Sequence, residues 1–143
     1  MKKQLNKNLI ERFSRQIVLK NIGILGQKKI LSAKVLVVGA GGLGCPAVEF
    51  LTRAGIGTLG IVDYDKVSLS NLHRQSLYEK KDIGKSKVLI VKKILNRINP
   101  NTKVQSYNLK LNNINFKKII NKYDYIVDGS DNFKTKFLLN DFC

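Results

Sequence analysis

The sequence VLVVGAGGLG, which occupies residues 35–44, decides the fold. Its first part, Val35–Val38, is a continuous apolar and mostly β-branched run, which is typical of a parallel strand buried on both faces. Its second part, Gly39–Gly44, fits the pattern G-x-G-x-x-G. A helix is predicted from Leu43 to Ala54, with Pro46 tolerated in its first turn. A glycine loop between a buried strand and a helix is typical of a nucleotide-binding turn.

The rest of the chain alternates between strand and helix signals. Further strands are predicted at Thr58–Asp63, Lys103–Tyr107 and Tyr123–Asp128, and further helices at 85–98, at 112–121 and from Asn132 onward. This alternation predicts an α/β fold with a Rossmann-like, doubly wound and mainly parallel sheet. No strand is predicted after the fourth, so we expect a sheet truncated there, with that strand at an exposed edge.

An N-terminal helical segment precedes this core. Leu9, Phe13 and Ile17 follow helical spacing, which predicts one helix over about residues 8–23, and a shorter helix is predicted at Gln27–Leu31. The length of 143 residues suits a single domain. We therefore assign residues 1–31 to an N-terminal helical arm and residues 32–143 to an incomplete Rossmann-like core.

The chain is strongly basic, with 26 Lys and Arg against 10 Asp and Glu and a formal net charge of +16. Such a charge can indicate nucleic acid, an anionic membrane or an acidic protein partner. Lysine, asparagine and isoleucine share A/T-rich codons and the lysines are scattered, so we favour compositional bias over nucleic-acid binding. No stretch reads as a membrane span or a secretory signal. The expected location is the cytoplasm, or the plastid stroma if the gene is organellar.

The glycine loop and one acid predict a nucleotide site. Gly39, Gly41, Gly42 and Gly44 would let a phosphate approach the backbone, and the following helix offers unpaired N–H groups and the positive end of its dipole. Asp63 ends the second strand, where a carboxylate can accept hydrogen bonds from ribose hydroxyls. A tight turn alone would explain the glycines but not the strand, helix and acid around them. The loop is compatible with NAD, FAD or ATP.

The loop after the second strand, DYDKVSLSNLHRQ at residues 63–75, resembles the signature D-x-D-x-V-x-x-S-N-L-x-R-Q of the MoeB/ThiF family. Four other segments resemble motifs of that family in the same order: RFSRQ at 12–16, GKSK at 84–87, NRINP at 96–100 and DGSDNF at 128–133. The resemblance covers nearly all of the chain from about Glu11 onward.

The resemblance implies an ATP-dependent adenylyltransferase that activates the C-terminal carboxylate of a ubiquitin-like sulfur-carrier protein, of the molybdopterin or thiamine type. In adenylation a carboxylate oxygen attacks the α-phosphorus of ATP and pyrophosphate leaves, so fixed cations lower the barrier. Arg74 and Lys87 suit the phosphates, and Asp131 suits Mg²⁺. The resemblance also implies that Arg15 serves the ATP of a neighbouring subunit, hence a homodimer. Further nucleotide contacts are expected from Asp65, Ser70, Asn71 and Asn132.

Other interpretations stay open at this point. Arg74 and Lys87 could be solvated cations, and Asp131 with Asn132 could simply cap the last helix. An NAD- or FAD-dependent oxidoreductase would explain the glycine loop and Asp63 but would leave those three charged residues without a role. A non-catalytic remnant that binds nucleotide is a further alternative.

Members of the resembled family continue past the segment that matches residues 138–143, with further strands, a sulfur-transfer cysteine and two C-x-x-C pairs that hold zinc. Here Cys45 and Cys143 lie far apart and match no metal spacing, so the zinc site of the family is expected to be absent. We expect the ATP-binding half of the active site to be intact. Whether this segment alone catalyses the complete reaction is left open.

Overall fold

The computed structural model describes residues 5–142. The expectation for Cys143 falls outside these residues. The elements, in chain order, are α1 (Lys7–Arg12), α2 (Ser14–Ile17), α3 (Gly23–Ser32), β1 (Lys34–Val38), α4 (Gly44–Ala54), β2 (Thr58–Val62), the 3₁₀ turns η1 (Leu69–Asn71) and η2 (Lys80–Asp82), α5 (Lys87–Ile98), β3 (Lys103–Tyr107), α6 (Asn113–Ile120), β4 (Tyr125–Asp128) and α7 (Phe133–Phe142).

The four strands form one parallel sheet in the order β3-β2-β1-β4. The valine-rich β1 is central because its residues are apolar on both faces, with Leu36 and Val37 completely buried. The chain passes from β1 to β2 and β3 on one side and returns with β4 on the other. This reversal is the hallmark of a doubly wound sheet, so the predicted fold class is confirmed.

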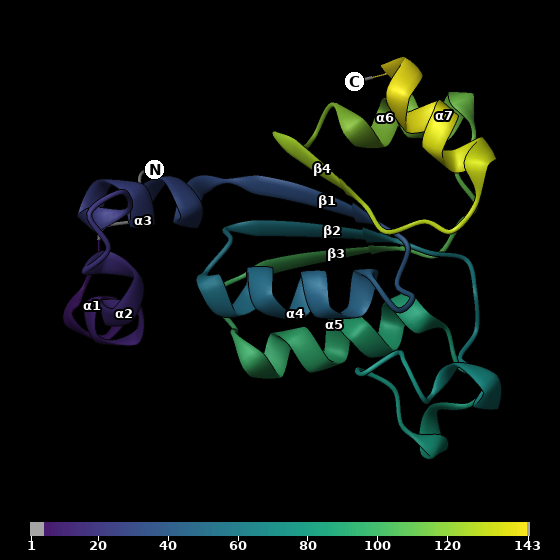
Figure 1. The fold of residues 1–143 in the computed structure, drawn as a ribbon, viewed down its shortest axis with the longest axis horizontal. Coiled ribbons are helices and arrows are strands. Elements are labelled where there is room, and N and C mark those ends of the chain that lie inside the picture. Colours follow the sequence, from purple (N-terminus) through teal and green to yellow (C-terminus); the bar gives the residue numbers. More distant parts are fainter. Residues whose placement is uncertain (1–4, 143) are drawn as a thin grey trace.

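Helices cover both faces of the sheet (Figure 1). On one face, α4 and α5 pack through a core that includes Val48, Val91 and Leu95. On the other face, α6 and α7 pack through a smaller core around Phe116 and Leu139. The amphipathic spacing of α5 faces the larger core as predicted, and the helix ends at the expected Asn99-Pro100 step.

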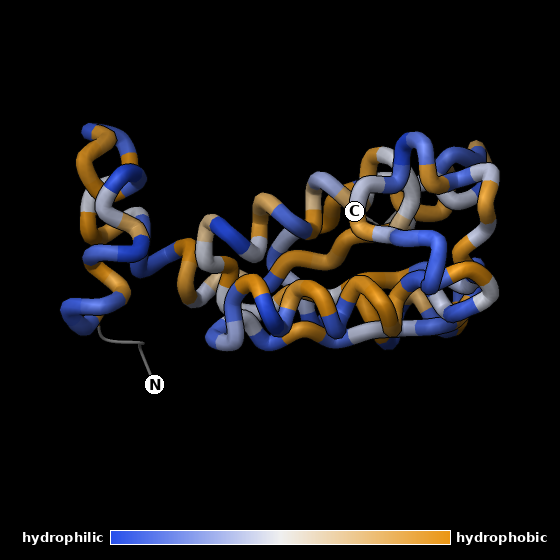
Figure 2. Tube along the Cα trace, turned by 90° about the horizontal axis from the view of Figure 1, so that it is seen from below, coloured by the Kyte–Doolittle hydropathy of each residue, from blue (hydrophilic) through white to orange (hydrophobic). Residues whose placement is uncertain are grey.

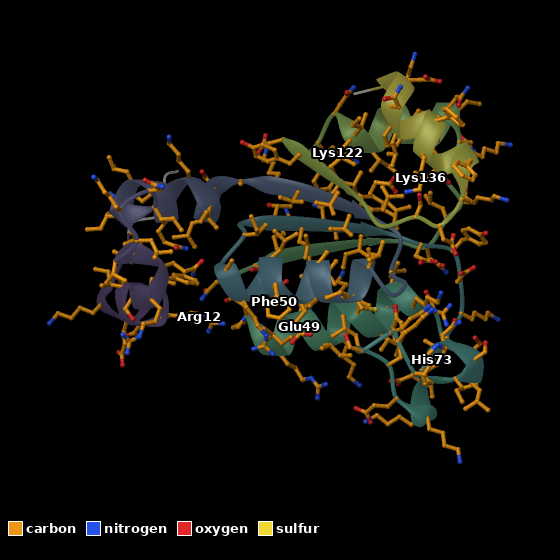
Figure 3. All side chains as sticks on the ribbon, in the orientation of Figure 1. Arg12, Glu49, Phe50, His73, Lys122 and Lys136 are labelled. Atoms are coloured by element: carbon orange, nitrogen blue, oxygen red, sulfur yellow. The ribbon has the colours of Figure 1, made fainter. Side chains whose placement is uncertain are left out.

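β4 lies at one edge of the sheet, as the strand count predicts, and it pairs only with β1 among the described residues. An open apolar groove runs beside this edge and is lined by Pro46, Ala47, Phe50, Leu51, Ala54 and Val127. The side chain of Phe50 projects from α4 and is 67% exposed (Figure 3). In the described part of the chain, no helix is long and apolar enough to span a membrane.

The prediction of one helix over residues 8–23 is wrong. The segment forms two short helices, α1 and α2, which meet at Phe13, and the predicted second helix begins earlier, at Gly23. The reason is tertiary: Phe13 is 1% exposed and its ring lies against Gly55 at the end of α4. Burying this ring requires a change of direction that helical spacing alone does not reveal.

Polar side chains of the arm, α1–α3, attach it to the main body. Arg12 donates to the carbonyl of Ile98 at the end of α5, while Gln16 and Gln27 both donate to the carbonyl of Ala54 at the end of α4. Helix ends carry unpaired carbonyls and partial negative charge, so amide and guanidinium donors suit them. The arm therefore lies at the amino-terminal end of the strands (Figure 1). In the view turned by 90°, the segment next to the N-terminus lies at one end of the molecule (Figure 2).

Substitution of Gly55 tests the contact between the arm and the main body. It has a φ of +92°, and a Cβ there would lie 2.5 Å from the Phe13 ring. Gly84 has a similar φ of +83°, but a Cβ there would meet nothing within 4 Å, so it isolates the backbone strain. We expect Gly84→Ala to lower the free energy of unfolding by about 1 kcal/mol and Gly55→Ala to lower it by about 2 kcal/mol or more. Urea denaturation followed by circular dichroism measures both, and equal losses would contradict the packing of Phe13.

Candidate functional site

The candidate site lies at the carboxyl ends of β1, β2 and β4. In a doubly wound sheet the crevice for ligands forms where the strand order reverses, which here is between β1 and β4. The glycine loop follows β1, Asp63 follows β2, and the DGSDN segment follows β4. The topology therefore brings three predicted motifs to one end of the sheet.

Two of the loop glycines are required by the fold itself. A Cβ at Gly44 would overlap the carbonyl oxygen of Gly39, and a Cβ at Gly39, whose φ is +92°, would lie 2.7 Å from the carbonyl oxygen of Gly129. Gly129 in turn donates its N–H to the carbonyl of Val38 at 2.8 Å. Three backbone segments thus meet without side chains, which fixes the start of α4 against the loop that follows β4.

Gly41 and Gly42 have a different role. A Cβ at Gly41 would meet only the amide nitrogen of Gln75, at 3.7 Å, and the three atoms nearest to one at Gly42 all belong to Arg74, at 3.7 Å or more. These are ordinary contact distances, and neither glycine has a positive φ. Packing within the protein does not require these two glycines, whereas a group that approaches the backbone closely would.

Arg74 lies beside the glycine loop, as these distances show. Its guanidinium is exposed and donates from Nη1 to the carbonyl of Ser70 at 3.2 Å. The turn η1 positions it, because the N–H groups of Arg74 and Gln75 both donate to the carbonyl of Asn71. Ser70 is exposed and Asn71 half-buried on the same turn. His73, which has no predicted role, lies 3.3 Å from the Arg74 guanidinium.

Asp63 joins the glycine loop to the loop after β2. Its carboxylate accepts the N–H of Ala40 at 2.7 Å through one oxygen and the N–H of Asp65 at 2.8 Å through the other. Each carboxylate oxygen has a second lone pair, so a ribose hydroxyl could still donate to it. The predicted position beside the loop is therefore found, together with a structural role that residue spacing does not indicate.

Lys87 is the first residue of α5 and is almost completely buried, at 4% exposure. A cation at this helix end is unfavourable unless an anion lies nearby. The anion is Asp65, whose carboxylate accepts from the Lys87 ammonium at 3.1 Å. A chain of hydrogen bonds thus runs from Lys87 through Asp65 and Asp63 to Ala40 in the glycine loop. The alternative that Lys87 is a solvated surface cation is wrong.

Tyr78 and Cys45 both form hydrogen bonds to the glycine loop, a role that no sequence pattern indicates. The Tyr78 hydroxyl donates to the carbonyl of Ala40 at 2.7 Å, and the Cys45 thiol reaches the same oxygen at 3.4 Å. Burial raises the pKa of the Tyr78 hydroxyl and also that of the Cys45 thiol. Both groups therefore stay protonated and act as donors, which fits the expected packing role of Cys45.

The segment after β4 carries the predicted metal ligand. The Asp128 carboxylate accepts from the N–H and hydroxyl of Ser130 and from the Lys136 ammonium. Burial works to raise the pKa of Asp128, but these donors outweigh it and hold the pKa below its usual value. Asp131 is exposed, and Asn132 accepts the N–H of Thr135. Asn132 therefore caps α7, in agreement with the plainer alternative for this residue.

Arg15 is the one predicted site residue that lies elsewhere. It belongs to α2 in the arm, near the amino-terminal end of the strands, and its side chain is exposed. Figure 3 shows Arg12, in the same arm, and His73, next to Arg74, at opposite ends of the molecule. Arg15 therefore does not join the glycine loop of its own chain.

Comparisons with known proteins agree with this geometry. The model of the ThiF family matches residues 13–143, and the chain belongs to this family. It is 46% identical over 98% of its length to the adenylyltransferase and sulfurtransferase MOCS3 of Anopheles gambiae. It is 44% identical over 94% of its length to a sulfur carrier protein adenylyltransferase of Thermus thermophilus.

A solved structure is also similar. The E. coli tRNA N6-threonylcarbamoyladenosine dehydratase TcdA, solved in complex with ATP, superposes with a TM-score of 0.90 at 26% identity, over 99% of this chain and 58% of that one. The chain spans 32% of the Anopheles relative and 50% of the Thermus relative. The likeness therefore concerns one part of larger proteins.

The ion pair between Lys87 and Asp65 can be tested without any ligand. Asp65→Asn would leave a buried ammonium without a counter-charge, and we expect a loss of about 1–2 kcal/mol in unfolding free energy, below the range for fully buried pairs because Asp65 is half-exposed. Lys87→Met removes the buried charge and should cost less. The double variant should resemble Lys87→Met alone in urea denaturation. Additive losses would show that the two groups do not interact.

Proposed function

We propose that this chain is the ATP-binding part of an adenylyltransferase that activates the C-terminal carboxylate of a ubiquitin-like sulfur-carrier protein. The observation that carries the proposal is that the side chain of one cationic residue packs beside the glycine loop and a second cation is joined to that loop by a chain of hydrogen bonds. Arg74 lies alongside Gly42, and Lys87 connects to Ala40 through two carboxylates. The names of the relatives from Anopheles and Thermus support the reaction type.

The proposed reaction gives each group a task. A carboxylate oxygen of the carrier protein forms a bond to the α-phosphorus of ATP as the bond from that phosphorus to the bridging oxygen breaks, and pyrophosphate leaves with the electron pair. Negative charge grows on the nonbridging and leaving oxygens. The Arg74 guanidinium would donate to these oxygens as a fork, and the Lys87 ammonium would act as a point charge. Asp63 would orient the ribose.

The residues present fit a nucleotide. Gly41 and Gly42 offer backbone that no side chain shields, and the first turn of α4 lies directly behind them. Backbone N–H groups at a helix start favour phosphate. Asp65 would have to share Lys87 with a phosphate, and its half-exposed carboxylate is free to move toward solvent. Ser70 and Asn71 would contribute short polar contacts from η1.

Mg²⁺ also fits, with a single protein ligand. The described residues contain no cluster of three or more acidic, histidine or cysteine side chains that could hold a metal alone. Mg²⁺ bound with nucleotides uses one or two carboxylates together with phosphate oxygens and water. Asp131, exposed at the end of the β4 loop, is the carboxylate we assign to it, and Asn132 would serve mainly by capping α7.

ATP binding and its dependence on Arg74 test the proposal. We expect Mg-ATP to bind in calorimetric titration and Arg74→Ala to weaken binding at least about ten-fold, because it removes a charged donor to phosphate. Radiolabelled pyrophosphate should exchange into ATP when a sulfur-carrier protein is added, and Arg74→Ala should reduce this exchange about 100-fold or more. The matched control is Arg53→Ala, an exposed arginine on α4 paired with Glu49. Tight binding of NADH without binding of ATP would favour an oxidoreductase instead.

We further propose a homodimer in which Arg15 of each copy serves the ATP of the other. Three residues of its motif already serve the fold: Arg12 and Gln16 donate to helix-end carbonyls, and Phe13 is buried. No hydrogen bond or ion pair joins Arg15 to another described residue. The glycine loop of the same chain lies at the opposite end of the sheet from Arg15. Arg15 could therefore contact only the glycine loop of a second molecule.

Mixing variants tests the homodimer. Arg15→Ala and Arg74→Ala should each abolish pyrophosphate exchange alone. In a mixed dimer, the site with an intact Arg74 receives an intact Arg15 from the other copy, so an equal mixture should regain about a quarter of the native rate. A mixture that stays inactive, although size-exclusion chromatography shows dimers, would contradict exchange of Arg15 between copies.

The pathway and compartment remain predictions. The names of the relatives favour molybdopterin or another sulfur-carrier pathway, and a relative from Porphyra purpurea, 46% identical over 92% of this chain, is described as a probable molybdopterin-synthase adenylyltransferase. Thiamine biosynthesis uses the same carrier chemistry and is our second choice. We retain the cytoplasm, or the plastid stroma for an organellar gene, as the expected location.

A further inference from the structure

Gln75 is a buried residue beside the glycine loop that the site described above leaves without a role. Its side chain is 4% exposed, and its amide nitrogen lies 3.7 Å from the position that a Cβ on Gly41 would take. The backbone around it is fixed, because its N–H donates to the carbonyl of Asn71 and its carbonyl accepts from the N–H of Tyr78. The carboxamide is therefore held against the surface where the loop lacks side chains.

The fold makes no use of the polarity of this side chain. The side-chain oxygen of Gln75, Oε1, is buried without a hydrogen-bond partner. Among the described residues, no hydrogen bond is formed by its side-chain nitrogen, Nε2. Gln27 differs from Gln75 only at the amide nitrogen: it is also buried and its Oε1 also lacks a partner, but its amide nitrogen donates to the Ala54 carbonyl at 3.0 Å. An apolar side chain of similar length would fill the Gln75 position without leaving a buried polar group unsatisfied.

From these observations we infer that Gln75 is a nucleotide-contacting residue, whose amide nitrogen donates to a phosphate oxygen lying over Gly41. The inference rests on the proposed ATP site. A phosphate against Gly41 would be within reach of the Gln75 amide nitrogen, which lies 3.7 Å from the position of the missing Cβ. Because the carboxamide is neutral, it would add a directed donor to the site without adding a further charge.

Substitutions distinguish a nucleotide contact from a structural role, because the two roles predict different effects on stability and on ATP affinity. Gln75→Met keeps the length of the side chain and removes the amide, so the free energy of unfolding without nucleotide should be unchanged or higher. Calorimetric titration with Mg-ATP should show about ten-fold weaker binding. Gln75→Glu places a carboxylate beside the phosphates and should weaken binding further. The matched control, Gln27→Met, removes an amide that the fold uses, so it should lower stability and leave ATP affinity unchanged.

The outcomes also separate this inference from the proposed function. If the native chain binds Mg-ATP and both Gln75 variants bind it equally well, the contact with phosphate is wrong and the ATP site stands. If Gln75→Met is destabilised to the same extent as Gln27→Met and keeps its ATP affinity, Gln75 is a structural residue. If the native chain itself binds no ATP, both the inference and the proposed function are overturned.

Discussion

The site depends on one steric constraint, which is the meeting of three backbone segments at Gly39, Gly44 and Gly129. No side chain fits between the end of β1, the start of α4 and the loop after β4. This contact sets where the helix N-terminus points and where the DGSDN segment begins. It also explains why α4 can start directly at the loop, with its amino-terminal end at the crevice. The loop that carries Asp131 is therefore held against the start of α4.

Within each motif, some residues maintain the fold and others are left available to a ligand. Gly39 and Gly44 are sterically required, whereas Gly41 and Gly42 are not. In the RFSRQ segment, Phe13 is buried and Arg15 is exposed. When the packing of the folded chain does not require the residue type found at a position, that residue is a better candidate for a functional role. Membership of a motif alone is weaker evidence. This distinction is invisible in the sequence because it depends on which atoms lie nearby.

The main body could be predicted from the sequence because its signals are local. The valine run, the glycine loop and the spacing of α5 each specify an element within one short window, and β3 has the predicted bounds. The arm could not be predicted in the same way, because the break at Phe13 depends on Gly55, far along the chain. In the site, the position of Asp63 beside the glycine loop could be predicted because Asp63 directly follows the end of β2.

The contacts that complete the site are beyond sequence reasoning for a physical reason. Asp65 is the counter-ion of Lys87, and Tyr78 fixes the Ala40 carbonyl, only because the long loop after β2 folds back beneath the glycine turn. That loop contains no periodic pattern, so its path could not be inferred from residue spacing. The burial of Lys87 and the unsatisfied amide of Gln75 appear only once this path is known.

The strand order also governs how the molecule can assemble during synthesis. β1 finds β2 soon after both are made, but its other flank must wait for β4, and the bond between Lys34 and Asp124 closes a separation of 90 residues. Pairings this distant in sequence form slowly because a long loop must be closed first. Until then the central strand β1 has one unpaired edge, so the growing chain is most vulnerable to mispairing of this edge just before β4 emerges.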